Sequence, residues 1–222
     1  MSRIEWDAAG EKKYEMGVDR GVLYPQASGG TYPKGVPWNG LSNVTESPEG
    51  AEATDIWADN IKYGSIRSTE VAKGTIEAYT YPPEFEPCQG KAELIEGVTI
   101  GQQDRTAFGF SYRTMIGSDV PSETEQYKIH LVYGATASPS EESHDTINDS
   151  PEPSPMSWEY DTVPVNVKGK KPTATLTIDS TKISAAALKA IEDKLYGDDS
   201  AGEPQLPLPD EVLSIISSAA KE

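Results

Sequence analysis

The feature that most constrains this chain is a set of short segments in which apolar and polar side chains alternate with a period of two. In residues 75–81, for example, Ile76, Ala78 and Thr80 alternate with Glu77 and two tyrosines. Alternation of this kind is typical of a β-strand with one buried face. Nineteen glycines and seventeen prolines divide the 222 residues into short elements, which favours β architecture over a helical bundle. We therefore expect a mainly β fold.

Seven segments are predicted as strands: residues 56–63, 75–81, 105–116, 127–135, 156–160, 163–167 and 173–178. One face of the fourth segment carries Tyr127, Ile129, Leu131 and Tyr133, and the buried face of the last carries Ala174, Leu176 and Ile178. Gly109 is a candidate bulge or bend within its strand. Residues 117–126 have the length of an extended hairpin loop between two of these strands.

Two helices are predicted near the end of the chain. Residues 184–196 place Ala187, Leu188, Ile191 and Leu195 on one face, and Gly197 follows as the C-terminal stop. Asp210 is predicted to cap a final short helix that presents Val212, Leu213 and Ile216. The proline-rich residues 203–209 between them predict a stiff, extended strap.

The first 55 residues combine many turn residues with recurring aromatic side chains. This mixture indicates an N-terminal arm with loops that anchors on another surface, because aromatic residues are enriched at subunit interfaces. The alternative is that the aromatic residues fill this chain's own core. We accordingly expect three parts: an arm with loops at 1–55, a β domain with one packed helix at 56–197, and a C-terminal strap with a short helix at 198–222.

The chain is strongly acidic, with a net charge of −17. Such a charge repels phosphates and anionic membrane surfaces, so neither tight nucleic-acid binding nor membrane association is expected. The acidity either keeps the protein soluble or allows DNA to pass without adhering. A single cysteine, Cys88, excludes an intramolecular disulfide framework. The N-terminal residues have no apolar core of signal-peptide length, so we expect folding in a cytoplasm.

The sequence offers little for catalysis. Two histidines, His130 and His144, with one cysteine show no zinc-binding spacing, and no phosphate loop, dinucleotide fingerprint or nucleophile elbow occurs. Residues 145–149 hold clustered oxygen ligands but lack the spacing of a calcium loop. They lie in residues 138–155, an acidic stretch typical of a surface loop. We expect no enzyme activity, no cofactor and no metal.

Several segments, in their order and spacing, resemble the major tail (tail tube) proteins of long-tailed bacteriophages. They are residues 17–24 (GVDRGVLY), 35–40 (GVPWNG), 47–54 (SPEGAEAT), 58–63 (ADNIKY), 76–82 (IEAYTYP), 97–103 (GVTIGQQ), 127–134 (YKIHLVYG), 146–152 (TINDSPE) and 171–179 (KPTATLTID). Together they cover most of residues 17–197.

The resemblance implies a β-sandwich or barrel with a packed helix, assembled as hexameric rings that stack into a tube. Each subunit of this family contributes strands to the wall of a lumen that conducts DNA during ejection. The implied partners are copies of the chain itself, the tape measure, terminator and baseplate proteins of the tail, and DNA in transit without specific binding. The implied location is the virion tail, assembled in the host cytoplasm.

Two sets of residues are candidates for these roles. Glu77, Glu93 and Glu96 lie in or beside predicted strands and are predicted to face the lumen, the alternative being that they face outward and only aid solubility. Predicted inter-subunit contacts are Tyr24, Tyr32, Trp38, Asp119 and Glu123.

Two other functions fit the sequence. A β-sandwich adhesin or capsid decoration protein would bind cell-surface glycans by stacking Tyr79, Tyr81 and Trp158 on sugar rings. A hydrolase of cell-wall polymers would use a pair of carboxylates, which a chain with 36 acidic residues can supply by chance.

Overall fold

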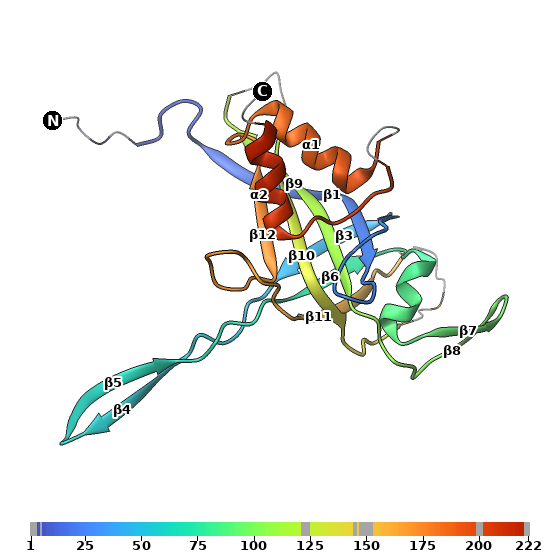
Figure 1. Ribbon diagram of the computed structural model, residues 1–222, viewed down its shortest axis with the longest axis horizontal. Coiled ribbons are helices and arrows are strands. Elements are labelled where there is room, and N and C mark those ends of the chain that lie inside the picture. The colour runs from blue at the N-terminus through green and yellow to red at the C-terminus, as the bar shows by residue number, and fades with distance from the viewer. Residues whose placement is uncertain are drawn as a thin grey trace.

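A computed structural model (Figure 1) describes residues 4, 6–120, 125–143, 146, 153–198 and 202–219. Within them, one antiparallel sheet of eight strands has the order β2-β1-β9-β10-β11-β6-β3, with β12 also paired to β10. Its strands are β1 (Lys13–Pro25), β2 (Val36–Trp38), β3 (Leu41–Glu46), β6 (Lys73–Ala78), β9 (Phe108–Ser118), β10 (Gln126–Ala137), β11 (Met156–Thr162) and β12 (Thr175–Asp179). The predicted mainly β fold is confirmed.

The sheet curls towards a barrel because its two end strands are neighbours in the sequence. Only Asn39 and Gly40 separate β2 from β3, and Leu41 of β3 packs against Gly21 of β1. The enclosed face holds an aromatic cluster in which the Trp38 ring centroid lies 4.5 Å from that of Phe85 and 5.6 Å from that of Trp158. Phe85 comes from a short 3₁₀ helix, η1 (Pro83–Gln89), which packs against this core.

Two helices cover the outer face of the strands around β10 (Figure 1). Helix α1 (Ala185–Tyr196) buries Ala187, Ile191 and Leu195, as its periodicity predicts. The Ser184 hydroxyl caps it by accepting from the Ala187 N–H at 3.3 Å, and Gly197 ends it at φ +79°. The predicted face of residues 127–135 is confirmed too, since Ile129, Leu131 and Tyr133 belong to this second core.

Helix α2 (Pro209–Ala219) exists as predicted, but two details differ. Asp210 lies inside the first turn, where its carboxylate accepts from the Lys168 N–H at 3.0 Å. The residue that binds back to the start of the helix is Glu211, which accepts from the Leu208 N–H at 3.0 Å. Val212 is buried, but Leu213 is 55% exposed, because it points away from the second core.

Five of the seven predicted strands are found with small changes in their bounds, and two are corrected. Residues 56–63 do not form one strand but turn back as a hairpin at Asp59 and Asn60, and residues 163–167 make only the single bridge Val165↔Thr173. The expected bulge is at Gly134 on β10, at φ +59°, where pairing with β9 shifts. At Gly109 the absence of a side chain instead leaves space for Leu206, because a Cβ added at Gly109 would lie 2.3 Å from Leu206 Cδ2.

The first 55 residues contribute strands β1, β2 and β3 to the main sheet. The proposed boundary at residue 55 is therefore corrected: these strands hydrogen-bond with β9 and β6, which belong to the β domain. Of the first 55 residues, the described part that precedes β1 extends away from the body as an arm (Figure 1).

Two hairpins lie outside the main sheet. The longer pairs β4 (Ala53–Ala58) with β5 (Ile61–Arg67), and the shorter pairs β7 (Ala92–Ile95) with β8 (Val98–Ile100). Figure 1 shows the β4–β5 hairpin reaching far from the body on two extended connections.

Candidate assembly surfaces

The β4–β5 hairpin is held by a tight turn whose two residues both take left-handed conformations. Asp59 and Asn60 have φ of +52° and +61°, which is the geometry of the two-residue turn that matches strand twist. Asp and Asn tolerate it better than other non-glycine residues. The local sequence therefore specifies a hairpin at this position.

One face of this ribbon is apolar. The register pairs Thr54 with Ile66, Ile56 with Gly64 and Ala58 with Ile61, which places the three isoleucines on the same face. Their side chains are 41% (Ile56), 63% (Ile61) and 62% (Ile66) exposed. The opposite face carries Trp57, which is 67% exposed, and the ion pair between Lys62 Nζ and Asp55 Oδ1 at 2.7 Å. An isolated two-stranded ribbon is marginally stable at best, so this one fits a surface that covers its isoleucines.

The shorter hairpin also exposes apolar side chains near its turn: Leu94 at 63%, Ile95 at 68% and Val98 at 45%. Glu93 stabilises that turn, because its Oε1 atom accepts from the Gly97 N–H at 3.0 Å. Glu96 stands exposed beside it. The carboxylate of Glu93 thus has a local structural role.

Glu77 lies elsewhere, on the outward face of β6, between residues that face the enclosed core. Its cross-strand neighbours are Asn43 on β3 and Ser157 on β11. The same outward face carries Glu159 and Asp161, the latter 3.4 Å from Lys73 Nζ. The three predicted lumen residues therefore belong to two different sheets, and only Glu77 is on the main one.

Most of the predicted inter-subunit residues have other roles. Tyr24, Tyr32 and Trp38 are 0%, 2% and 2% exposed, so they fill this chain's own core and the contact prediction for them is wrong. The alternative interpretation, core packing, is correct for these three. Asp119 is exposed and accepts from the Gly10 N–H at 3.1 Å. Glu123 lies outside the described residues.

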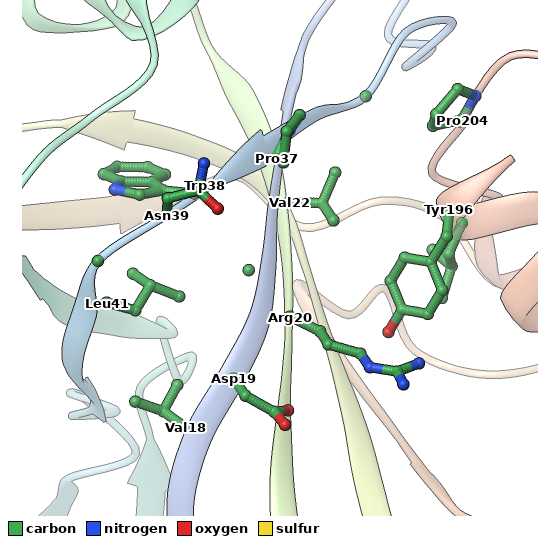
Figure 2. A pocket seen from close by; sticks show the side chains of 14 residues that line it. Val18, Asp19, Arg20, Val22, Pro37, Trp38, Asn39, Leu41, Tyr196 and Pro204 are labelled. Atoms are coloured by element: carbon green, nitrogen blue, oxygen red, sulfur yellow. The ribbon is translucent and has the colours of Figure 1, made fainter.

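A groove of about 540 Å³ lies where the curled sheet closes. Figure 2 shows Arg20 and Tyr196 on one side of it and Leu41 with Trp38 on the other. Asp19 forms an ion pair with Arg113, whose guanidinium donates to both carboxylate oxygens at 2.8 and 2.6 Å. This bond and the nearby charge hold the pKa of Asp19 below its usual value. Arg20 adopts φ +50° beside it and is half exposed.

The residues with potential chemical reactivity are shielded. Cys88 is buried in η1, and desolvation raises the pKa of its thiol to about 12. Burial lowers the pKa of His130, which stacks on Tyr112 with ring centroids 4.6 Å apart. Among the described residues no three His, Cys, Asp or Glu side chains gather as a metal site, and no helix is long and apolar enough to cross a membrane.

The aromatic platform suggested for glycan binding is mostly inside the protein. Trp158 is 3% exposed and its ring meets that of Tyr81 edge-on at 5.6 Å. Tyr81 is partly buried against the first core, and only Tyr79 is well exposed, at 52%. These three side chains therefore do not form a surface on which a sugar ring could stack.

The isoleucine face is a surface that the sequence pattern does not predict, because that pattern predicts residues 56–63 as one strand. The local signal for a hairpin is the pair Asp59-Asn60, two residues that accept left-handed conformations, in the middle of that segment.

No protein-family model matches the sequence, and no curated protein matches it at a significant level.

Proposed function

We propose that this chain is a structural subunit whose copies form rings that stack into a tail tube of the bacteriophage type. The single observation that carries the proposal is the isoleucine face of the projecting β4–β5 hairpin. Covering three isoleucines that are 41–63% exposed contributes about 1 kcal/mol or more for each side chain. The sequence resemblance to tail tube proteins supports the same conclusion.

The proposal requires an open polymer and not a closed dimer. The hairpin extends well beyond the body (Figure 1), and in this proposal a different surface of the neighbouring copy receives it. Contacts between unlike surfaces produce rings when the rotation closes and stacks or filaments when it does not. A second apolar hairpin, β7–β8, provides a further contact. Six-membered rings, and the tape measure, terminator and baseplate proteins as further partners, follow from the family resemblance.

The charge suits a conduit for DNA. A subunit with a net charge of −17 makes a wall that does not retain phosphates. The outward face of β6 and β11, with Glu77, Glu159 and Asp161, is the acidic strand surface we assign to the lumen. In this proposal the protein is not an enzyme and needs no cofactor.

Negative-stain electron microscopy of the concentrated full-length protein tests the proposal. We expect hollow tubes with regular cross-striations. A population of closed, compact oligomers at every concentration would contradict it. Binding of such oligomers to cell-surface glycans would support the adhesin in its place.

A further inference from the structure

The groove at the closure of the sheet is a preformed pocket. Leu41 of β3 packs against Gly21 of β1 and fills the seam between these two strands. Across the groove, the chain after α1 is fixed by a hydrogen bond in which the Gly35 N–H donates to the Pro204 carbonyl at 2.7 Å. The volume of about 540 Å³ is within the range of small-molecule sites in proteins.

An irregularity in β1 places Arg20 at this groove. The pairing of β1 with β9 shifts twice, between Met16 and Asp19 and between Asp19 and Val22. Within this bulge Arg20 adopts a left-handed conformation, with φ +50°, which is unfavourable for a residue with a Cβ atom. Bulges redirect side chains, and strained residues of this kind concentrate at ligand-binding sites. The backbone therefore presents a cation to the groove at a cost in stability.

The positive charge of Arg20 has no close partner among the described residues. Its Nη1 atom lies 4.0 Å from Glu192 Oε1, and that oxygen already accepts from the Tyr127 hydroxyl at 2.7 Å. The neighbouring carboxylate, that of Asp19, forms its ion pair with Arg113. The Arg20 side chain is 51% exposed, so its guanidinium is accessible to a ligand.

A buried hydroxyl group lies beside this guanidinium. The Tyr196 hydroxyl has no hydrogen-bond partner among the described residues. Figure 2 shows it directed towards the Arg20 side chain, whose guanidinium carbon is 5.8 Å from the centre of the Tyr196 ring. A buried hydroxyl without a partner is costly in free energy and rare in folded proteins. A ligand that brings an acceptor to Arg20 would also satisfy this hydroxyl.

The other walls of the groove are mainly aliphatic. They include the side chains of Val18, Val22, Pro37, Leu41, Leu195 and Pro204. A carboxylate matches the polar groups, because it accepts from a guanidinium and from a phenol at the same time. Arg20 is the only lysine or arginine among the lining residues, which favours a monoanion over a phosphate dianion. The matching ligand therefore has one carboxylate and an aliphatic chain.

We propose that the groove binds a small amphipathic carboxylate. Its carboxylate accepts from the Arg20 guanidinium and the Tyr196 hydroxyl, and its aliphatic chain lies along Val22, Leu41 and Leu195. Binding requires the Arg20 side chain to lift from the Tyr196 ring, which its exposure permits. Because the walls come from β1, the link between β2 and β3 and the end of α1, the ligand binds only the folded chain and stabilises it. This proposal is independent of tube assembly.

Calorimetric titration of the dilute full-length protein with octanoate tests the proposal, and 1-octanol is the matched ligand without a charge. Arg20→Gln should weaken octanoate binding about tenfold or more, as loss of a charge-assisted hydrogen bond predicts. Octanol should bind this variant and the wild type equally, which shows that the groove is intact. Lys170→Gln, the same charge change on an exposed turn, should leave octanoate binding unchanged. Absence of octanoate binding, or equal octanoate affinities of the two variants, would overturn the proposal.

Tyr196→Phe tests the second polar contact. The hydroxyl has no partner in the free protein, so its removal should not lower the free energy of unfolding, but it should weaken octanoate binding several-fold. Octanoate should also raise the midpoint of thermal unfolding of the wild type more than that of Arg20→Gln. Wild-type affinity for octanoate in Tyr196→Phe would contradict the contact with the hydroxyl.

The isoleucine face of the β4–β5 hairpin is the competing apolar surface for such a ligand. A variant with Ile56, Ile61 and Ile66 replaced by serine removes that face and leaves the groove unchanged. Octanoate should bind this variant with wild-type affinity, and nuclear magnetic resonance should show shifts of the Gly21 and Gly40 amide signals at the groove. Loss of octanoate binding in the serine variant would place the ligand on the hairpin and refute the groove site.

Discussion

Trp38 and Trp57 are the same residue type, but one fills the core and the other stands on the projecting hairpin, at 2% and 67% exposure. Replacing Trp38 with alanine removes its ring contacts with Phe85 and Phe110 and its hydrogen bond to the Thr80 carbonyl, so we expect a loss of about 3–5 kcal/mol in the free energy of unfolding. Trp57→Ala should change that free energy by about 0.5 kcal/mol or less. Urea unfolding of both variants measures the contrast, and equal losses would contradict the placement of these two side chains.

The carboxylate of Asp19 stabilises the fold through its ion pair with Arg113. Asp19→Asn leaves the guanidinium of Arg113, which is 5% exposed, without its ion pair. Because Asp19 itself is partly exposed, we expect a loss of about 1–2 kcal/mol at pH 7.

The pH dependence of that loss has a defined sign. The pKa of Asp19 is lowered in the folded state by the hydrogen bond from Arg113. Its stabilising contribution is therefore complete above the unfolded value, about 3.9, and disappears as the pH falls through the folded value. The difference between wild type and Asp19→Asn in chemical denaturation should shrink below about pH 3.9. A difference that is constant down to pH 2 would show that the charge is not its cause.

Single residues also show how far sequence reasoning reaches. Periodicity assigned Ile129, Leu131, Ile191 and Leu195 to the core correctly, because each lies in an element long enough to define a face. Periodicity could not decide whether Tyr24, Tyr32 and Trp38 pack in the core or contact another subunit, because large aromatic side chains suit both environments. The burial of Tyr24, for example, depends on the pairing of β1 with β9, 83 or more residues away in sequence, which no local pattern specifies.

The β4–β5 hairpin is the element on which assembly depends. Replacing Ile56, Ile61 and Ile66 together with serine removes the apolar face, while the turn and the Asp55–Lys62 ion pair remain. We expect the variant to keep the unfolding free energy of the body, because the hairpin stands apart from both cores (Figure 1), and to lose polymerisation.

A matched control changes the other face of the same ribbon. Ser65→Thr and Lys62→Gln alter residues on the ion-pair face and leave the isoleucines in place. Sedimentation velocity should detect large assemblies for this control and only small species for the serine variant. Assembly of both to the same extent would remove the isoleucine face from the account.

The elements themselves were predictable to different degrees. The apolar face of residues 184–196 and the glycine that follows it predict a helix, and both features are local. The curl of the sheet was not predictable, because it depends on β2 and β3 joining opposite ends of an eight-stranded order. The groove was missed for the same reason: its walls come from β1, the turn after β2 and the end of α1.

At the scale of the whole molecule, the net charge opposes assembly of the subunits and apolar contacts favour it. Subunits of charge −17 repel one another, and added salt screens that repulsion without weakening the burial of isoleucine. Raising the salt from about 0.05 M to 0.5 M should therefore lower the protein concentration at which assembly begins. Light scattering across a dilution series measures this threshold. A threshold that rises with salt would mean that opposite charges, not apolar faces, hold the subunits together.

A cryo-electron microscopy reconstruction of the assembled protein tests the central claim most directly. The account predicts stacked rings around an open bore, with Ile56, Ile61 and Ile66 of each hairpin covered by a neighbouring copy and the acidic face of β6 and β11 towards the bore. Hairpins that stay in solvent, or a bore lined by lysine and arginine, would contradict it.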